Sequence, residues 1–153
     1  MFIVLEGIDK SGKGTQALKI LDYLKKEKGL DVWLTHEPTY QGLVGRLINF
    51  ILKKKIKLPP LFFQKLYVLD RKIHLFEIKK QLKKGKVIVC DRYFYTTIAF
   101  GHAGGFNVSK IIKWHQKMLR PDLLFLSISQ VKKRCLELKK KKVNLNCLRE
   151  KIF

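Results

Sequence analysis

The stretch Gly7–Gln16, "GIDKSGKGTQ", decides the fold of this chain. Its glycines and Lys13 stand at the spacing of a phosphate-binding loop, in which four residues separate two glycines and a lysine follows the second. Such a loop carries a serine or threonine after the lysine, as a magnesium ligand, whereas this chain has Gly14 there and the hydroxyl one residue later, on Thr15. Either this is a nucleotide site with a shifted metal ligand, or it is a chance cluster of glycines.

The residues on either side of this stretch favour the nucleotide site. Phe2–Glu6, "FIVLE", predicts a short strand, and apolar residues at helical spacing predict a helix from Lys13 to about Lys28. A glycine-rich turn between a strand and a helix aims backbone N–H groups at phosphate oxygens, and Lys13 would reach the terminal phosphates as a point charge. The sequence therefore predicts phosphate binding by the following residues: Gly7, Ile8, Asp9, Lys10, Ser11, Gly12, Lys13, Gly14 and Thr15.

Further along the chain, continuous apolar strands alternate with helical patterns. Strands are predicted at Asp31–Glu37, Lys86–Asp91 and Asp122–Ile128. Helices are predicted around Leu43–Ile51, Leu61–Lys84, Thr96–His102, Ser109–Leu119 and Val131–Lys140. This alternation predicts one α/β domain over residues 1–153, with a parallel sheet of four strands covered by helices on both faces. Ligands bind at the carboxyl ends of such strands, where "HEPT" and "DRY" stand here.

Asp91 ends the apolar strand "VIVC" and is the second candidate for holding a metal ion. An acid after a strand is commonly only a cap, but beside a phosphate loop a carboxylate can hold the water shell of magnesium. The sequence therefore predicts Mg²⁺, with Thr15 and Asp91 as its protein ligands. The four histidines show no metal-binding spacing, and structural roles are expected for all of them.

Composition excludes several other classes of protein. A chain of 153 residues with 46% hydrophobic residues is expected to form a globular core. No apolar run reaches the ~18 residues of a membrane span, and the start "MFIVLEG" does not fit a signal peptide. Three cysteines without metal or disulfide spacing favour free thiols in a reducing cytoplasm.

The net charge of +21 favours anionic ligands, either nucleotides or nucleic acid. Most of the excess is lysine, in runs such as "IKKQLKKGK", which are more often solvated helix faces than binding grooves. A nucleic-acid partner would depend on charge alone and is not expected.

Five blocks of the sequence together resemble the thymidylate kinase family, over Met1 to about Arg134: "FIVLEGIDKSGKGTQ", "THEPT", "LYVLDRKIHL", "DRYFYTTIAF" and "RPDLLFLSI". The resemblance implies the P-loop NTPase fold, with three αβα layers. It also implies transfer of the γ-phosphoryl group of ATP to dTMP, giving dTDP, and a homodimer. The pair Gly14-Thr15 is similar to that of adenylate-kinase-like loops, which keeps Thr15 as the hydroxyl for magnesium.

The resemblance also implies roles for single residues. Tyr67 would stack on the thymine, and Arg71, four residues later on the same helix face, would reach the acceptor phosphate. Phe100 would crowd the sugar 2′ position, and Thr96 and Thr97 would hydrogen-bond the base edge. The implied catalytic residues are Lys13, Arg92, Lys10 and Asp9, and the implied acceptor-binding residues are Glu37, Pro38, Tyr67, Arg71, Arg92, Thr96, Thr97 and Phe100.

Other roles for these residues stay open. Tyr67 lies near an apolar stripe of Phe62, Leu66, Leu69, Ile73 and Phe76, which would be either core or a dimer face. Arg71 would alternatively pair with Glu77 or Asp70, and the two threonines would alternatively cap a helix.

The sequence departs from the family at several positions. His36 stands where an arginine is usual, which predicts a weaker or pH-dependent grip on the acceptor phosphate. The fourth strand ends in "SIS" where an Asp-Val pair is usual. The lid is expected to be reduced, near residues 138–146, with Lys10 or the run Lys139–Lys142 replacing lid arginines.

A fifth strand is expected to be missing, which would expose apolar surface beside the first strand. The second functional hypothesis is therefore a non-catalytic or degenerate nucleotide-binding relative.

Overall fold

The structure is a computed structural model and describes residues 1–127. Its elements are β1 (Phe2–Gly7), α1 (Lys13–Lys26), β2 (Val32–His36), α2 (Gly42–Lys54), α3 (Pro60–Lys83), β3 (Val87–Asp91), α4 (Phe94–Ala103), α5 (Val108–Trp114) and β4 (Leu123–Ser127). The predicted alternation of strands and helices is confirmed over this range. The helix expected at Val131–Lys140 and the reduced lid near 138–146 lie outside the described residues.

The four strands form one parallel sheet in the order β2-β3-β1-β4. Leu5 and His36 both pair with Asp91, and Gly7 pairs with Ser127. All four carboxyl ends therefore lie at one edge of the sheet, as the sequence predicts for a ligand site.

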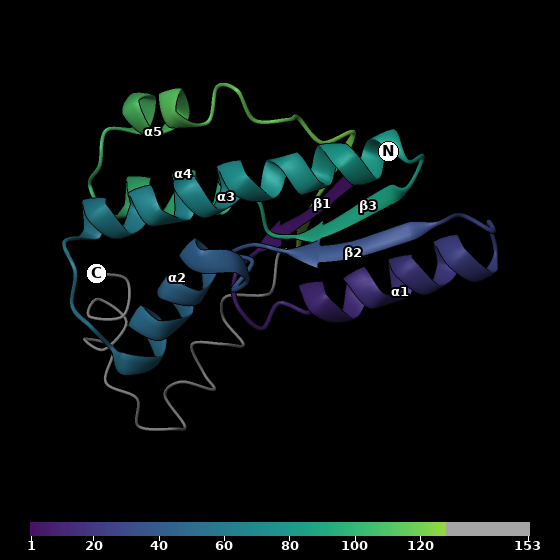
Figure 1. The fold of residues 1–153 in the computed structure, drawn as a ribbon, viewed down its shortest axis with the longest axis horizontal. Coiled ribbons are helices and arrows are strands. Elements are labelled where there is room, and N and C mark those ends of the chain that lie inside the picture. Colours follow the sequence, from purple (N-terminus) through teal and green to yellow (C-terminus); the bar gives the residue numbers. More distant parts are fainter. Residues whose placement is uncertain (128–153) are drawn as a thin grey trace.

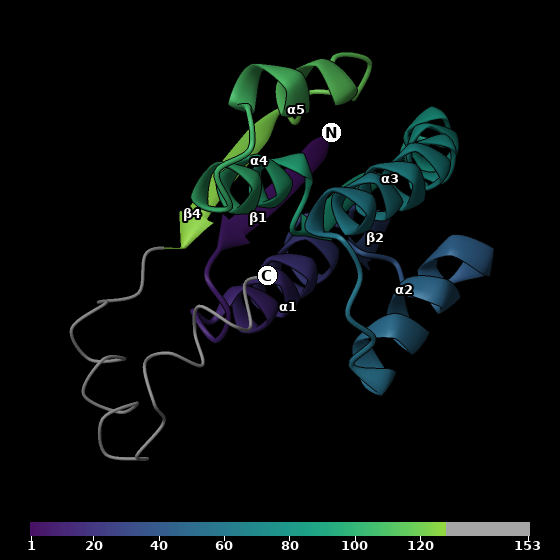
Figure 2. The same ribbon diagram turned by 90° about the vertical axis from the view of Figure 1, so that its left-hand side faces the viewer.

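Helices cover both faces of the sheet, so the three-layer αβα architecture is confirmed (Figures 1 and 2). Alternate residues of β1 point to opposite faces. Ile3 and Leu5 pack with Ala17 of α1, whereas Phe2 and Val4 pack with Leu75 and Ile78 of α3 and with Tyr93, directly before α4. Strands buried on both faces read as continuous apolar runs, which explains why they could be recognised from the sequence.

The apolar stripe of α3 does not form the core. Of its five members only Leu66 is buried, and Phe76 keeps 77% of its surface exposed. The buried face carries Val68, Leu75 and Ile78 instead, together with charged residues. The reading of this stripe as core is therefore wrong. Both faces of α3 carry apolar side chains, so hydrophobic periodicity cannot tell the outer face from the inner one.

Helix α5 ends at Trp114, five residues before the predicted end at Leu119. The side chain of His115 explains the difference. Its Nδ1 lies 2.8 Å from the carbonyl oxygen of Ile111, which is the acceptor that the His115 backbone N–H would need to continue the helix. The backbone N–H donates to Ile112 instead, and the chain turns toward β4.

Within residues 1–127, strand β4 ends the sheet beside β1 and is largely exposed, with 46–65% of the surface of Leu123, Leu124, Phe125 and Leu126 accessible. Exposed apolar surface beside the first strand was expected and is found on β4, whereas the missing fifth strand from which it was predicted falls outside the described residues. None of the helices within residues 1–127 has the length and apolar character that crossing a membrane requires.

Candidate active site

The predicted phosphate loop, residues 7–15, joins β1 to α1 in a conformation that depends on glycine. Gly7 has φ +142° and Gly12 has φ +87°, a region that side chains rarely adopt. A Cβ on Gly7 would lie 2.4 Å from the carbonyl oxygen of Ser127. The Ser127 hydroxyl also donates to the Ser11 carbonyl at 2.8 Å, so the end of β4 supports the loop directly.

Lys13 is buried at the start of α1 and folds back over the loop. Its Nζ donates to the carbonyl of Ile8 at 2.6 Å and lies 3.4 Å from Ser11 Oγ. Burial lowers the pKa of Lys13, and the nearby Arg92 adds to this effect. The ammonium group is thus held against the phosphate loop.

A cavity of about 310 Å³ lies over the loop and collects most of the predicted phosphate and metal residues. They are Asp9, Lys10, Gly12, Lys13, Gly14, Thr15, Asp91 and Arg92. Residues that follow β1 and residues at the end of β3, far apart in the sequence, therefore line one cavity that carries both positive and negative side chains.

Asp91 fits the predicted magnesium site. Its Oδ1 is buried and has no hydrogen-bond partner, and its Oδ2 lies 3.9 Å from where a Cβ on Gly14 would be. An unsatisfied buried carboxylate oxygen is costly unless a ligand satisfies it. Residues 1–127 contain no group of three or more His, Cys, Asp or Glu side chains able to hold a metal by themselves. The donor set therefore suits Mg²⁺ that keeps waters and is shared with phosphates.

Arg92 follows β3 and reaches the phosphate loop. Its Nη1 donates to the Gly7 carbonyl at 2.8 Å and to Thr96 Oγ1 at 3.2 Å, and its Nη2 forms an ion pair with Asp9. Arg92 itself has φ +70°, a conformation that turns the chain from β3 toward α4. Three residues predicted for the site, Asp9, Arg92 and Thr96, are thereby brought together.

Glu6 supports this region and was missed by sequence reasoning. Its carboxylate accepts hydrogen bonds from the backbone N–H groups of Tyr93 at 2.8 Å and Thr96 at 3.2 Å, and from the Thr96 hydroxyl. Burial raises the pKa of Glu6, and these hydrogen bonds oppose the shift. Glu6 caps α4 from a neighbouring strand, because the N-cap residue Tyr93 makes no side-chain cap. The signal that could have identified Glu6 is an acidic residue within a strand of otherwise apolar residues.

The contact with Glu6 changes what Thr96 can do. A hydroxyl has one proton to donate, and Thr96 gives it to Glu6. Only an acceptor lone pair is left for the base edge at which the resemblance places Thr96. The alternative that Thr96 caps α4 by itself is not what the structure shows.

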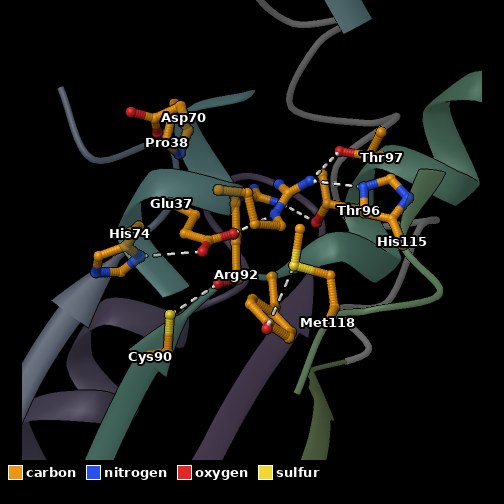
Figure 3. A network of polar contacts seen from close by, with 12 residues as sticks. Glu37, Pro38, Asp70, His74, Cys90, Arg92, Thr96, Thr97, His115 and Met118 are labelled. Atoms are coloured by element: carbon orange, nitrogen blue, oxygen red, sulfur yellow. Dashed lines mark hydrogen bonds and ion pairs between the residues drawn. The ribbon is translucent and has the colours of Figure 1, made fainter. Parts of the chain in front are cut away.

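Arg71 lies deeper, in a network of buried polar side chains that we call the Arg71 network: Glu37, Arg71, His74, Thr97 and His115. Its Nε forms an ion pair with Glu37, and its Nη1 lies 3.0 Å from Thr97 Oγ1 and 3.1 Å from His115 Nε2. Figure 3 shows Glu37 beside His74, with Thr97 and His115 together on its other side. The predicted alternative partners of Arg71, Glu77 and Asp70, are wrong.

Glu37 is the centre of this network and is almost fully buried. One carboxylate oxygen contacts Arg71 and the other lies 3.0 Å from His74 Nδ1. His74 Nε2 in turn lies 2.9 Å from Thr35 Oγ1. Both oxygens therefore have a buried partner, and through one of them Glu37 orients Arg71.

The remaining predicted acceptor residues, Pro38, Tyr67 and Phe100, do not line the cavity over the loop. Tyr67 is half-buried, with its ring 4.7 Å from that of Phe63, and burial raises its pKa. The Glu37-Pro38 peptide bond is cis. Phe100 is 42% exposed.

His36 is exposed at the end of β2, where its Nδ1 lies 2.8 Å from the Pro38 carbonyl and its ring packs 5.7 Å from that of Tyr40.

Comparison with known proteins identifies relatives of the chain. A family model described as "Thymidylate kinase" matches residues 5–153. The chain is 40% identical to a probable thymidylate kinase of Thermococcus onnurineus over 82% of its own length, and 34% identical to the thymidylate kinase of Plasmodium falciparum over 81%. It spans 65% and 59% of the length of these two relatives. The crystal structure of the Ehrlichia chaffeensis thymidylate kinase superposes with a TM-score of 0.75 at 33% identity, covering 83% of this chain and 74% of that one.

Proposed function

The chain belongs to the thymidylate kinase family, and we propose that it transfers the γ-phosphoryl group of ATP to dTMP in the cytoplasm, giving dTDP and ADP. The observation that carries the proposal is the meeting of the phosphate loop, Asp91 and Arg92 in one cavity, next to a buried Arg71. An anionic donor and an anionic acceptor both need positive groups that are fixed in advance, and this edge of the sheet supplies them.

The reaction needs little covalent help from the protein. An oxygen of the dTMP phosphate attacks the γ-phosphorus, and the bond from that phosphorus to the bridging oxygen of ADP breaks. Lys13 and the loop N–H groups would hold the donor phosphates, and Lys10 would stabilise the transferring group as an exposed point charge. Arg92 would hold the acceptor phosphate, and its ion pair with Asp9 fixes it at the loop.

Mg²⁺ would be held by Asp91 and Thr15 and would neutralise charge on the donor phosphates. On the acceptor side, Tyr67 would stack on the base, Arg71 and Thr97 would contact the acceptor, and Phe100 would lie against the sugar. Glu37 and Pro38 would shape this pocket from behind. These assignments follow the family resemblance, and the contact between Arg71 and Thr97 supports placing these two side chains together.

Purified protein would test the reaction. ADP release would be measured with ATP and magnesium in the presence of dTMP, dUMP, dCMP or AMP, with Lys13→Ala as the control. We expect turnover that is selective for dTMP and falls at least about 100-fold in the control. Saturable binding of ATP or dTMP without turnover would favour the non-catalytic binding relative instead.

We further propose that the protein forms a homodimer through the outer faces of α2 and α3. Leu43, Ile73 and Phe76 keep 54–89% of their surface exposed, and Leu43 and Ile73 line the same hollow between the two helices. Exposed apolar surface of this kind marks protein interfaces. Sedimentation analysis should give a dimer for the wild type and a monomer for Phe76→Glu, whereas Lys79→Glu at a charged neighbouring position should stay dimeric.

A further inference from the structure

His115 lies outside every motif block, yet it contacts the acceptor side of the proposed site. Its Nδ1 is 2.8 Å from the Ile111 carbonyl, which can only accept a hydrogen bond, so Nδ1 must carry a proton. Its Nε2 is 3.1 Å from Nη1 of Arg71, which can only donate. Both contacts are satisfied only by the neutral imidazole with its proton on Nδ1. Helix α5 therefore fixes the tautomer that can accept from Arg71.

The contacts of Arg71 leave one of its nitrogens available. Nε is taken by Glu37, and the two protons of Nη1 are taken by Thr97 and His115. Nη2 makes no hydrogen bond to any other residue within 1–127. Because it is also not one of the fully buried polar atoms without a partner, it keeps some accessible surface. Three anchors, one directly after β2, one in α4 and one directly after α5, thus fix the plane of the guanidinium group while Nη2 keeps its two donors. A planar fork held in this way is preorganised for a ligand.

The surroundings of His115 hold its ring in place. The Phe94 ring of α4 stacks against it at 5.5 Å with an interplanar angle of 26°. The charged groups that face it are Arg71 and, beyond Arg71, Glu37 with His74, and Lys72 acts from the same helix as Arg71. A proton on Nε2 would place a second donor against Arg71, so the contact requires the neutral form.

We propose that His115 is a positioning residue of the acceptor site: through its neutral Nε2 it fixes Arg71 so that Nη2 faces the acceptor nucleotide. The inference depends on the proposed function for the identity of the acceptor. It adds a residue that acts through Arg71 and does not touch the nucleotide.

Two variants separate this role from simple packing. His115→Phe keeps an aromatic ring against Phe94 but removes both polar contacts, whereas the Oε1 atom of His115→Gln restores an acceptor for Arg71. Steady-state kinetics would give kcat and the KM values for dTMP and ATP. We expect the KM for dTMP to rise about tenfold in the phenylalanine variant and to return to within about threefold of wild type in the glutamine variant. The KM for ATP should stay within about twofold in both.

An equal rise in the two KM values, or an unchanged KM for dTMP in His115→Phe, would overturn the proposal. The wild-type protein gives a second measurement that does not depend on the folding of a variant. Long-range ¹H–¹⁵N spectra, with His115 assigned through its contact to Phe94, should show an unprotonated Nε2 at neutral pH. A protonated Nε2 would overturn the proposal.

Titration calorimetry with dTMP separates failure of this inference from failure of the proposed function. Wild-type protein that binds dTMP without turnover would overturn the kinase function. In that case the tenfold effect expected for His115→Phe would be measured as a tenfold higher dissociation constant for dTMP. Equal dTMP affinity of the wild type and this variant would overturn the positioning role. Absence of dTMP binding by the wild type would overturn both.

Discussion

The phosphate loop and the Arg71 network lie at the same edge of the sheet but are built in different ways. The loop is one short stretch of backbone, residues 7–15, that borders an open cavity. The Arg71 network joins side chains from four segments, and Glu37 and Arg71 are both at least 96% buried as side chains. Phosphate recognition by backbone N–H groups needs glycines at fixed places, whereas a buried arginine needs several partners to offset its desolvation. The two regions should therefore respond differently to mutation.

The largest expected effect is on the loop side. Lys13→Met should lower kcat by about 100- to 1,000-fold, because the ammonium group would stabilise charge that develops during transfer. The free energy of unfolding should change little, since a desolvated charge is removed together with its contact to Ile8. Steady-state kinetics and urea unfolding of the same preparations would check both. A stability loss as large as the loss of rate would contradict the contrast between the two regions.

Glu37→Gln tests the Arg71 network, where the expected effect is a loss of stability. Removing one charge of a buried pair leaves Arg71 uncompensated, and the free energy of unfolding should fall by about 3–5 kcal/mol. Glu77→Gln is the matched control, since its ion pair with Lys80 is exposed and its removal should leave the free energy of unfolding nearly unchanged. Equal, small losses for the two variants would show that the Arg71 network does not hold the fold.

The pH dependence of stability sharpens the comparison further. Burial lowers the pKa of His115 to about 4 from its usual 6.5. His115 therefore takes up a proton near pH 6.5 in the unfolded chain but only near pH 4 in the folded chain. The stabilisation that comes from the neutral His115 is complete above pH 6.5 and is lost as pH falls toward 4. Between pH 7 and pH 5 the loss should be about 2 kcal/mol.

Urea unfolding of the wild type and His115→Gln at these two pH values isolates the contribution of His115. The variant should lose about 2 kcal/mol less than the wild type over this range. Parallel behaviour of the two proteins would mean that His115 is not kept neutral in the fold.

The smallest expected effect is at His36, at the end of β2. His36 is exposed and stands where the family resemblance implies an arginine. His36→Arg should lower the KM for dTMP about threefold by adding a bidentate donor, with stability changed by less than about 0.5 kcal/mol. A rise in this KM would show that position 36 does not face the acceptor phosphate.

The sequence predicted one of these regions far better than the other. The phosphate loop and the strands are contiguous patterns, so glycine spacing and apolar runs located them directly. The Arg71 partner was missed because Glu37 lies 34 residues away and carries no local signal. Glu77 and Asp70 were nearer in the sequence but point elsewhere, and Asp70 binds the backbone N–H and hydroxyl of Thr39.

Errors elsewhere have the same origin. Because apolar residues lie on both sides of α3, their spacing did not reveal which face is buried. The early end of α5 depends on the hydrogen bond between the His115 side chain and the backbone carbonyl of Ile111. Side chains that act across elements, such as Glu6 on α4, become visible only once the sheet brings distant segments together. Local patterns therefore locate backbone-built sites better than sites built from buried side chains.

The most direct test of the proposed function follows the transferred group itself. The protein would be incubated with dTMP, magnesium and ATP labelled in the γ-phosphoryl group, and the labelled product would be identified by chromatography. If the loop and the Arg71 side form one transferase site, the label will appear in dTDP and will be lost from it in Lys13→Met. Label found only in inorganic phosphate, or retained in ATP, would contradict the account.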